Sequence, residues 1–299
     1  MNYIILDLEW DSAYSVKHKR FINQILQIGA VKLDEAFNIT DTFEETVKSA
    51  ISKKVTGRFA ALTGITTQKM LTGVPFDTAV DRYNAWAENN TVTMTWSDSD
   101  LYSIKENEEC LLSGGRKFAI EKYLDLQKFV QGELRRGGYE DKNQVSLSLA
   151  AELLGVKTDS FELHTAKDDS LLSVALLKKC YNAERFSALI RNTADPEFYK
   201  RLRFKPYNIS DINDERINKD DLRFLCDKCG GKAKRITKWH YRNRWFTAKF
   251  ECKECHRRFS GRVTFKKTYD DLIVRKRITE LKPKTEKKQN EMQSVSEKV

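Results

Sequence analysis

Two C-x-x-C pairs near the C-terminal end place the tightest constraint on how this chain folds. Cys226 and Cys229 form the first pair, and Cys252 and Cys255 form the second. Each pair makes a short turn that presents two thiolates, and four thiolates complete a tetrahedral zinc site. Because no coordination position then stays open, the spacing predicts one structural Zn²⁺ inside a small β-hairpin module.

The positive charge of the chain is concentrated around these cysteines. The net charge is +10, and residues 221–267 carry 15 Lys and Arg against 4 Asp and Glu, whereas residues 1–220 carry 30 against 33. Such a basic block suits the phosphates of nucleic acid, although an acidic protein partner fits it too. Nucleic-acid binding is therefore the favoured interpretation, and a protein-docking surface stays open beside it.

Basic and aromatic side chains interleave within this block. Exposed rings stack on bases while cations follow phosphates, but a module this small also needs some rings for its core. The candidate nucleic-acid contacts are Lys238, Trp239, Arg242, Arg244 and Trp245. The module as a whole resembles a zinc ribbon.

The rest of the chain alternates strand and helix patterns. Extended segments are expected at 3–10, 25–33 and ending near 47, followed by a helix over 76–87 and a strand over 91–96. Ser146 begins a helix that stops at Gly155, and a long helix covers about 168–180. We expect an α/β domain over residues 1–190, a linker over 191–220, the basic ribbon over 221–267, and a charged, largely disordered tail over 268–299.

The 299 residues contain neither an apolar run of the roughly 18 residues that a membrane span needs nor a secretory signal pattern. The expected location is therefore the cytoplasm, without a membrane partner. Thiols stay reduced there, which again favours zinc over disulfides.

Acidic side chains lie in the first predicted strand, 3–10, and just after the strand over 91–96. Asp7 and Glu9 alternate with Leu8, so both carboxylates leave the same face of one strand. Two neighbouring carboxylates repel each other unless a cation lies between them. Asp100 comes just after the second β-run, where capping a helix is the simpler explanation of an aspartate.

A histidine and an aspartate precede and open the last long helix. His164 lies five residues before Asp169, which falls on the helix face of Leu172 and Leu176. A carboxylate on a core-facing stripe needs a partner, and a metal ion supplies one. The alternative is that Asp169 only complements the positive helix N-terminus while His164 is an ordinary loop residue.

The order of these residues over positions 1–185 resembles that of the DEDDh exonucleases, which have an RNase H-like fold. The shared features are D-x-E on the first strand, an aspartate after a later strand, and H-x(4)-D at a terminal helix. Three further segments match: 27–31, 62–66 and 123–127. Within the family the chain is most similar to the ERI-1-like RNA exonucleases and the sporulation-inhibitor proteins.

The resemblance implies an RNase H-like mixed β-sheet flanked by helices, and a 3′-to-5′ exonuclease that releases nucleoside 5′-monophosphates. It implies that Asp7, Glu9, Asp100 and Asp169 hold two Mg²⁺ or Mn²⁺ ions, and that His164 is the general base. The chain departs from its relatives at Ser97, where they often have Gly, and at residues 161–163, where a Gly-rich approach is usual. Both departures leave the geometry of the loops open.

The substrate implied is single-stranded nucleic acid with a free 3′ end, RNA rather than DNA. Leu62 and Ile65 are expected beside the terminal nucleotide and Trp10 stacks on a base, with core packing as the alternative for all three. A DNA-directed exonuclease differs only in substrate. The rival from another class is a nucleic-acid-binding or regulatory adaptor that keeps the fold without turnover.

Overall fold

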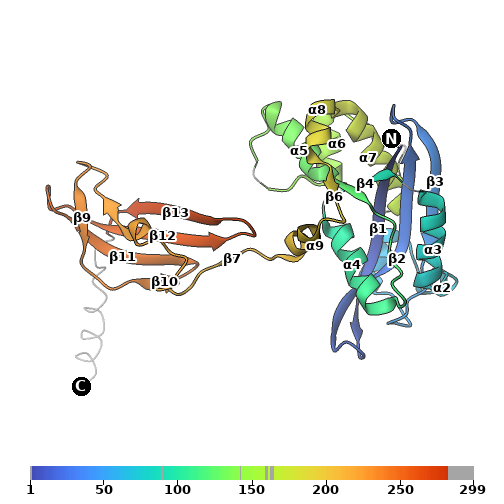
Figure 1. Cartoon of the computed structure of the whole chain (residues 1–299), viewed down its shortest axis with the longest axis horizontal. Helices are drawn as coiled ribbons and strands as arrows, with labels where there is room; N and C mark the ends of the chain where they lie inside the picture. The colour runs from blue at the N-terminus through green and yellow to red at the C-terminus, as the bar shows by residue number, and fades with distance from the viewer. Residues whose placement is uncertain (1, 89, 142, 159–160, 162–164, 282–299) are drawn as a thin grey trace, which may run out of the picture. The chain divides into compact units, whose positions relative to one another are not determined.

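The computed structural model describes residues 2–88, 90–141, 143–158, 161 and 165–281 of the chain. Its internal contacts divide the chain into two units, Met1–Arg203 and Phe204–Val299, which are shown in Figure 1. Among the described residues, no helix has the length and apolar character needed to cross a bilayer.

The first unit is built on a six-stranded mixed sheet with the order β3-β2-β1-β4-β5-β6. The strands are β1 (Asn2–Ser15), β2 (Arg20–Leu33), β3 (Ile39–Thr46), β4 (Thr91–Thr95), β5 (Lys122–Asp125) and β6 (Arg191–Asn192). β1 is antiparallel to β2 and parallel to β4. β1 pairs with β4 only as far as Ile5, opposite Met94, so Asp7 and Glu9 lie where β4 is ending.

Nine helices of the described part of the first unit surround this sheet (Figure 1). They are α1 (Gly57–Thr63), α2 (Thr67–Leu71), α3 (Phe76–Ala87), α4 (Ser99–Leu111), α5 (Leu126–Arg136), α6 (Leu147–Leu154), α7 (Ala166–Cys180), α8 (Ala183–Leu189) and α9 (Pro196–Arg203). α3 has the predicted bounds, and α6 begins after Ser146, whose side chain accepts a hydrogen bond from the Leu149 amide. It ends at Gly155, which has a left-handed φ of 64°.

The alternation of side chains along β1 gives the sheet two apolar faces. Ile5 packs with α5, α6, α7 and α8, whereas Ile4, Leu6 and Leu8 pack with α3 and α4. Asp7 and Glu9 continue the face of Ile5, because they are two and four residues further along the strand. Helices on both faces of a mixed sheet confirm the predicted α/β class.

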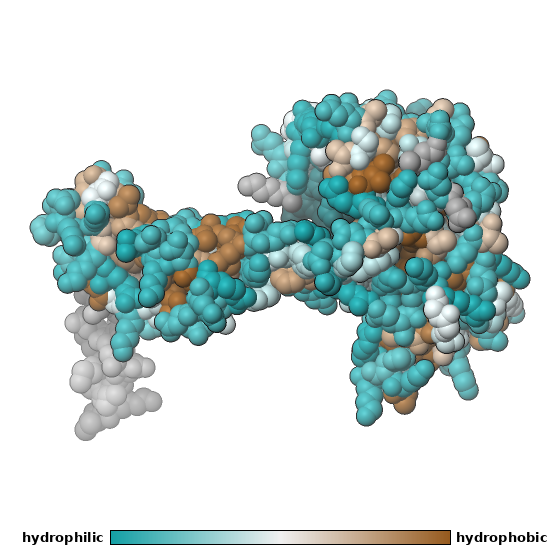
Figure 2. Space-filling view, in the orientation of Figure 1, coloured by the Kyte–Doolittle hydropathy of each residue, from teal (hydrophilic) through white to brown (hydrophobic). Residues whose placement is uncertain are grey.

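β1 and β2 extend beyond the sheet as a two-stranded hairpin whose residues pair as far as Ser15 and Arg20. Its end exposes Tyr14, Val16 and Phe21. Figure 2 shows the surface coloured by hydropathy, with mostly hydrophilic residues and several hydrophobic areas between them. The sequence pattern predicted strands ending at residue 10 and beginning at residue 25. The extension was missed because both of its faces carry polar residues.

The second unit is a seven-stranded sheet with the main order β13-β12-β11-β9-β8, in which β10 also pairs with β11 and β7 with β12. The strands are β7 (Tyr207–Asn208), β8 (Phe224–Leu225), β9 (Lys232–Arg235), β10 (His240–Arg242), β11 (Trp245–Cys252), β12 (Arg258–Lys267) and β13 (Leu272–Thr279), with a 3-10 helix η1 (Lys219–Leu222). Phe246, Phe250, Phe259 and Phe265 form the centre of its core. This unit is the β-module with four clustered cysteines that the cysteine spacing predicts, and its cysteines form no disulfide.

The expected domain boundaries differ from these units. Residues 191–203 belong to the first unit, where β6 pairs with β5, and Ile209 and Ile217 are buried in the core of the second. The prediction of a linker over 191–220 was therefore wrong. The few apolar residues of this segment are spaced irregularly along the sequence, but the structure buries them. The 268–299 tail was also set too early, since β13 pairs along β12 as far as Thr279.

Candidate active site and metal centres

A β-bulge shapes the strand pair that carries the first two acids. Glu9 is opposite Gln27 and Trp10 is opposite Ile25, so Leu26 is an extra residue on β2. Leu26 is fully buried, and its carbonyl accepts a hydrogen bond from the Val47 amide at 2.8 Å. The bulge bends the strands directly beside Glu9, and bulges are common next to functional sites.

The start of α7 is held against β2 by short-range contacts. Ser170 Oγ donates to the Ala166 carbonyl at 2.8 Å and lies 3.3 Å from the Gly29 carbonyl. Gln27 is buried, and its Oε1 lies 3.5 Å from the Ala166 amide nitrogen while its Nε2 donates to Glu44 at 3.0 Å. These contacts fix the first turn of α7 over the strand that faces Asp7.

Asp169 joins Asp7 and Glu9 in one carboxylate cluster. Thr165 caps α7 by accepting a hydrogen bond from the Asp168 amide, which places Asp169 in the first turn. Ligand oxygens of Asp7, Glu9 and Asp169 all lie within 4.8 Å of one another. Asp169 is 160 residues from Glu9 in the chain, so only the tertiary structure brings it to the two acids of β1.

Asp100 approaches these acids from α4, and its charge acts on Asp7, although it is not one of the three acids whose oxygens lie within 4.8 Å of one another. Asp98 is the N-cap residue of the helix, so Asp100 lies in the first turn and does not serve as the cap. Its side chain is 2% exposed, and Oδ1 has no hydrogen-bond partner among the described residues. A buried carboxylate oxygen without a partner is costly, and a cation would satisfy it.

The loop before α4 is held in an unusual conformation. Ser97 has a φ of 85°, which is the left-handed region that favours glycine. Tyr123 Oη donates to the Ser97 carbonyl at 3.0 Å and lies 2.8 Å from Thr95 Oγ1. Position 97, where relatives often have Gly, is thus one where glycine fits without strain. In this chain polar contacts hold a serine in the same conformation.

The acids strongly perturb one another. Burial, followed by the charges of Asp100, Glu9 and Asp169, raises the pKa of Asp7 well above its ordinary value. Burial and the charge of Asp169 raise the pKa of Glu9 to about 8. Burial also raises the pKa of Asp100, while the backbone amides of Asp100 and Leu8 oppose the shift. Negative charge is therefore unfavourable at this site until a cation compensates it.

The chemistry of this donor set fits hard divalent cations. All the ligand atoms are carboxylate oxygens, which Mg²⁺ and Mn²⁺ prefer, and Asp100 contributes an oxygen that no protein group among those described satisfies. Asp7, Glu9 and Asp169 are close enough to share an ion. His164, the predicted general base, lies outside the described residues.

The residues predicted to contact the terminal nucleotide separate in the structure. Leu62 is 52% exposed on α1, whose start is fixed by two hydrogen bonds from Thr56 to the Asp11 carboxylate. Ile65 is fully buried with Leu26 and cannot reach a nucleotide, so core packing is the correct interpretation for it. Trp10 is half-buried and packs against the α3 and α4 face.

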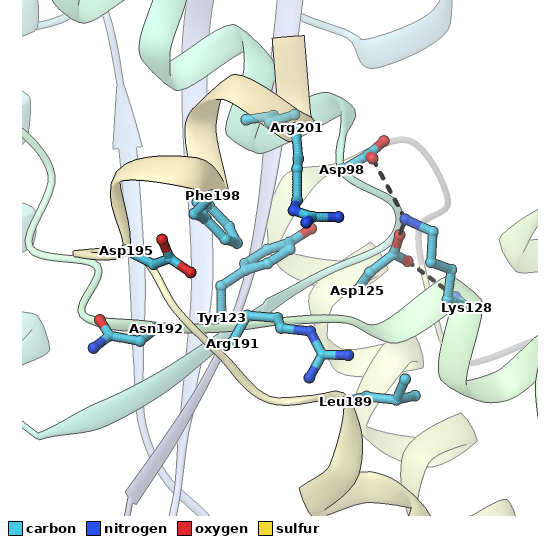
Figure 3. Close-up of a pocket in the computed structure, with 11 residues that line it drawn as sticks. Asp98, Tyr123, Asp125, Lys128, Leu189, Arg191, Asn192, Asp195, Phe198 and Arg201 are labelled. Atoms are coloured by element: carbon cyan, nitrogen blue, oxygen red, sulfur yellow. Dashed lines mark hydrogen bonds and ion pairs between the residues drawn. The ribbon is translucent and has the colours of Figure 1, made fainter. Parts of the chain in front are cut away.

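A separate pocket of about 550 Å³ lies beside β5 and β6, at one edge of the sheet, and sequence reasoning did not identify it. Figure 3 shows Lys128 between Asp98 and Asp125, with Arg201 approaching Tyr123 from α9. Lys128 Nζ lies 2.7 Å from Asp125 and 3.5 Å from Asp98. None of the four predicted acids lines this pocket, so it is not the site of the carboxylate chemistry.

The four cysteines of the second unit converge at the ends of two hairpins. The first pair lies between β8 and β9 and the second between β11 and β12, with sulfur-to-sulfur distances of 3.4–3.6 Å. Tetrahedral zinc with bonds of about 2.3 Å would separate its sulfurs by about 3.8 Å, close to this arrangement. The backbone amides of Lys228 and Cys229 lower the pKa of Cys226 to about 7, which favours the thiolate that a metal binds.

The predicted nucleic-acid contacts of this unit do not form one surface. Trp239 packs against Phe224 and Phe250 in the core, with ring centroids 6.4 and 5.7 Å apart. Arg242 and Trp245 are paired across β10 and β11, while Lys238 and Arg244 lie in exposed turns. The stacking role predicted for Trp239 is therefore wrong, because the small core needs that ring.

Comparison with known proteins locates the first unit in a known family. The model of a family described as RNase_T, exonuclease, matches residues 5–177 of the chain. Searching the curated proteins finds no match.

Several solved structures are similar to this chain. Cell-death related nuclease 4 (CRN-4) is 21% identical with a TM-score of 0.50, over 60% of this chain and 62% of that chain. The nuclease domain of 3′hExo, a DEDDh family member bound to rAMP, is 18% identical with a TM-score of 0.49, over 60% and 90%. A zinc-bound E. coli ExoI–ssDNA complex is 13% identical with a TM-score of 0.48, over 83% and 54%. The chain thus spans less than two thirds of the CRN-4 chain, and that similarity shows the RNase H-like fold.

Proposed function

Because this chain belongs to the RNase_T exonuclease family, we propose that it hydrolyses single-stranded nucleic acid from the 3′ end and releases nucleoside 5′-monophosphates. The family match confirms the predicted resemblance and the metal-dependent nuclease class. The observation that carries the proposal is the convergence of Asp7, Glu9 and Asp169 within 4.8 Å, beside the buried carboxylate of Asp100.

Asp7, Glu9, Asp100 and Asp169 are the proposed ligands of two Mg²⁺ or Mn²⁺ ions. When bound, such ions activate a water molecule and stabilise the charge on the phosphoryl and leaving oxygens. The chain's own contribution is to hold four carboxylates on a strand and two helix starts, so that little reorganisation is needed. Burial and the repulsion between the acids raise the pKa of Asp7, and a bound cation would offset both costs.

His164 is the proposed general base. It directly precedes Thr165, the residue that caps α7, and Asp169 follows in the first turn of the same helix. An imidazole titrates near neutral pH and therefore accepts a proton from water without remaining permanently charged. Replacing His164 by Ala should leave metal binding intact and lower the turnover number.

The substrate proposed is RNA rather than DNA, which rests on the similarity to the ERI-1-like exonucleases. Leu62, exposed at the end of α1, is the remaining candidate for packing against the terminal base. Asp11 and Thr56 fix the helix that carries it. The cytoplasm is the location proposed, since thiols stay reduced there and four cysteines remain available to zinc.

The test uses one oligonucleotide sequence made as RNA and as DNA, labelled at the 5′ end or at the 3′ end. With Mg²⁺ the wild type should release 3′-labelled mononucleotide at once and shorten the 5′-labelled strand stepwise. Asp7→Asn should lose at least about a hundredfold in rate, as expected when a group that stabilises transition-state charge is removed. Full activity of that variant would refute the carboxylate site.

A titration with Mn²⁺ separates the enzyme from the adaptor alternative. Calorimetry should show Mn²⁺ binding to the wild type that disappears in Asp169→Asn. The matched control is Asp168→Asn, the neighbouring acid in the same first turn, which lies outside the carboxylate cluster. An adaptor would bind the oligonucleotide but show neither the metal binding nor the hydrolysis.

A further inference from the structure

We propose that one face of the second unit's sheet binds single-stranded nucleic acid along its sugar-phosphate backbone, without requiring a 3′ end. We call it the basic sheet face, and its members are Lys234, Arg242, Trp245, Lys249, Arg258, Arg262, Lys266, Arg275 and Arg277. The inference rests on the proposed function only for the identity of the ligand, which would be the strand that the exonuclease degrades.

Side-chain alternation along β11 defines which face this is. Phe246, Ala248 and Phe250 are buried in the core, so Trp245 and Lys249 point to the opposite side. The register carries the same division across the sheet, because Val263 is opposite Phe246 whereas Arg262 is opposite Thr247. The core side chains of β11 and β12 therefore lie on one face of the sheet, and Trp245, Lys249 and Arg262 lie on the other.

The outermost strand adds cations that the cysteine motif does not contain. On β13, Arg277 is directly opposite Arg262 and Arg275 is opposite Thr264. Both arginines are exposed, and they lie beyond the 221–267 block to which the sequence pattern assigned the basic module. The basic surface is therefore wider than the interleaved segment of basic and aromatic residues in the sequence.

The Arg262–Arg277 pair is unfavourable in the absence of a ligand. Like charges directly opposite on neighbouring strands are destabilising. Within the described part of the chain, no acidic side chain lies within ion-pair distance of either arginine or of Arg275. The carboxylate of this face, Glu251, already pairs with Arg258 at 3.3 Å. Apart from Arg258, the cations of this face have no acidic side chain within ion-pair distance among the described residues, which suits them to bind a polyanion.

An aromatic ring lies among these cations. The Arg262 guanidinium carbon lies 5.2 Å from the centre of the Trp245 ring, and Arg242 is opposite Trp245 on β10. Trp245 is half-buried, so part of its ring remains open to stacking. A base stacked on an aromatic side chain contributes about 1–3 kcal/mol without regard to sequence, and cations beside it reach the flanking phosphates.

The geometry favours a nucleic-acid strand over an acidic protein segment. Four adjacent strands, β10 to β13, carry most of the cations of this face. At a strand spacing of about 4.8 Å these strands span roughly 14 Å, which suits contacts to successive phosphates. An acidic peptide would satisfy the charges but would have no base for Trp245. A strand of nucleic acid uses both features.

The test measures binding of a circular single-stranded oligonucleotide to the full-length chain, since a circle offers no 3′ end to the acidic site. Arg275→Ala/Arg277→Ala removes two cations from the basic sheet face. The matched control, Lys228→Ala/Lys253→Ala, removes two exposed lysines of the same unit that lie at the cysteine turns. Zinc content and the melting temperature of each variant report whether the unit stays folded.

Each lost phosphate contact lowers the slope of log K against log salt by about 0.7 for a single strand, so the face variant should lower it by about 1.4. We expect at least a tenfold loss of affinity in that variant and less than a twofold loss in the control. Equal effects of the two variants, or unchanged affinity of the face variant, would overturn the proposal. So would equal competition by poly-glutamate at the same charge concentration, which would indicate an acidic polypeptide as partner.

Failure of this proposal is distinguishable from failure of the proposed function. If the circle does not bind while linear RNA is degraded, the exonuclease proposal is supported and the proposal of the basic sheet face is refuted. If the circle binds wild type and Asp7→Asn equally but neither variant hydrolyses linear RNA, the binding surface stands without the enzyme. Trp245→Ala should weaken circle binding with no change in the salt slope, because a ring releases no counterion.

Discussion

Gly29 on β2 lies so close to Ala166 at the start of α7 that a Cβ atom built on Gly29 would be 2.7 Å from the Ala166 Cβ and nearer still to the Ala166 carbonyl carbon. Gly29 is also directly opposite Asp7 in the sheet. The glycine therefore sets the distance between the strand that carries two acids and the helix that carries Asp169. A side chain there would push the third acid away from the others.

Gly29→Ala should destabilise the first unit by about 1–3 kcal/mol, because overpacking against backbone leaves no flexible neighbour to move. Activity should fall more than stability, since Asp169 moves with α7. Thermal unfolding and hydrolysis rate measure the two effects. Gly57→Ala is the control, because a Cβ at Gly57 meets nothing within 4 Å. Normal activity of Gly29→Ala would contradict the role assigned to the close approach.

Glu9→Gln should stabilise the metal-free protein at alkaline pH. The pKa of Glu9 is raised from 4.5 to about 8 in the folded protein. Ionising Glu9 therefore costs more free energy in the folded protein than in the unfolded chain. The metal-free wild type should therefore lose stability as the pH rises from about 4.5 through 8, and the variant should lose less. After allowance for screening we expect a difference of about 1–2 kcal/mol at pH 8.5 and almost none at pH 4.

Denaturant melts without divalent ions at pH 4 and 8.5 measure that difference. Added Mg²⁺ should reverse the order, because the wild type gains a ligand that the variant binds less tightly. A variant less stable than wild type at pH 8.5 without metal would show that Glu9 is not repelled in the cluster.

Cys252→Ser should unfold the second unit and leave the first intact. Cys252 is fully buried and within 3.4 Å of Cys229, and structural zinc contributes about 10–16 kcal/mol in small zinc domains. Zinc content, together with proteolysis that spares a fragment of the first unit's size, checks the outcome. Cys180→Ser is the matched control, since that thiol lies on α7 in the first unit and its hydrogen bond is to the Leu176 carbonyl. Full zinc content in Cys252→Ser would exclude the four-cysteine site.

Ser97→Gly should raise stability slightly or leave it unchanged, whereas Ser97→Val should lower it. A left-handed φ of 85° costs a residue with a Cβ about 1–2 kcal/mol and is worse for a β-branched one. Valine also has no hydroxyl group to make the contact of Ser97 Oγ with Ser99. Comparing the melting temperature of each variant with that of wild type tests this prediction. If valine were tolerated as well as glycine, the loop before Asp100 would not depend on this backbone conformation.

Leu62→Ala and Ile65→Ala should have opposite signatures. Ile65 is fully buried, so its truncation should cost about 2–4 kcal/mol of stability and affect substrate binding little once the protein is folded. Leu62 is 52% exposed, so its truncation should change stability by less than about 0.5 kcal/mol. A raised KM for a short RNA in Leu62→Ala alone would support its packing against the terminal base, and an unchanged KM would exclude it.

Much of the site was predictable from the sequence because local patterns carry it. Alternation in β1 places Asp7 and Glu9 on one face, and helical spacing places Asp169 above Leu172. The cysteine pairs predict their own convergence, since two C-x-x-C turns at this spacing are typical of a four-cysteine zinc site. These features depend on neighbours within a few residues, which a sequence displays directly.

The remaining features depend on contacts between distant residues. Nothing in the local pattern shows that Ile65 is buried beside Leu26, that Trp239 belongs to a core, or that β13 brings Arg277 opposite Arg262. The 191–220 segment read as a linker because its apolar residues lack a period, yet Ile209 and Ile217 are buried by strands that follow them in the chain.

The sequence by itself therefore determined which side chains are the candidates for metal binding, namely the acids of the first unit and the thiols of the second. Only the tertiary structure decided how close the acids come, through the glycine contact of β2 with α7, and which cations share a face, through the register of β12 with β13. The physical reason is that residue type and short-range periodicity are local properties. Strand register and helix-to-sheet distance, in contrast, are set by packing between segments that are far apart along the chain.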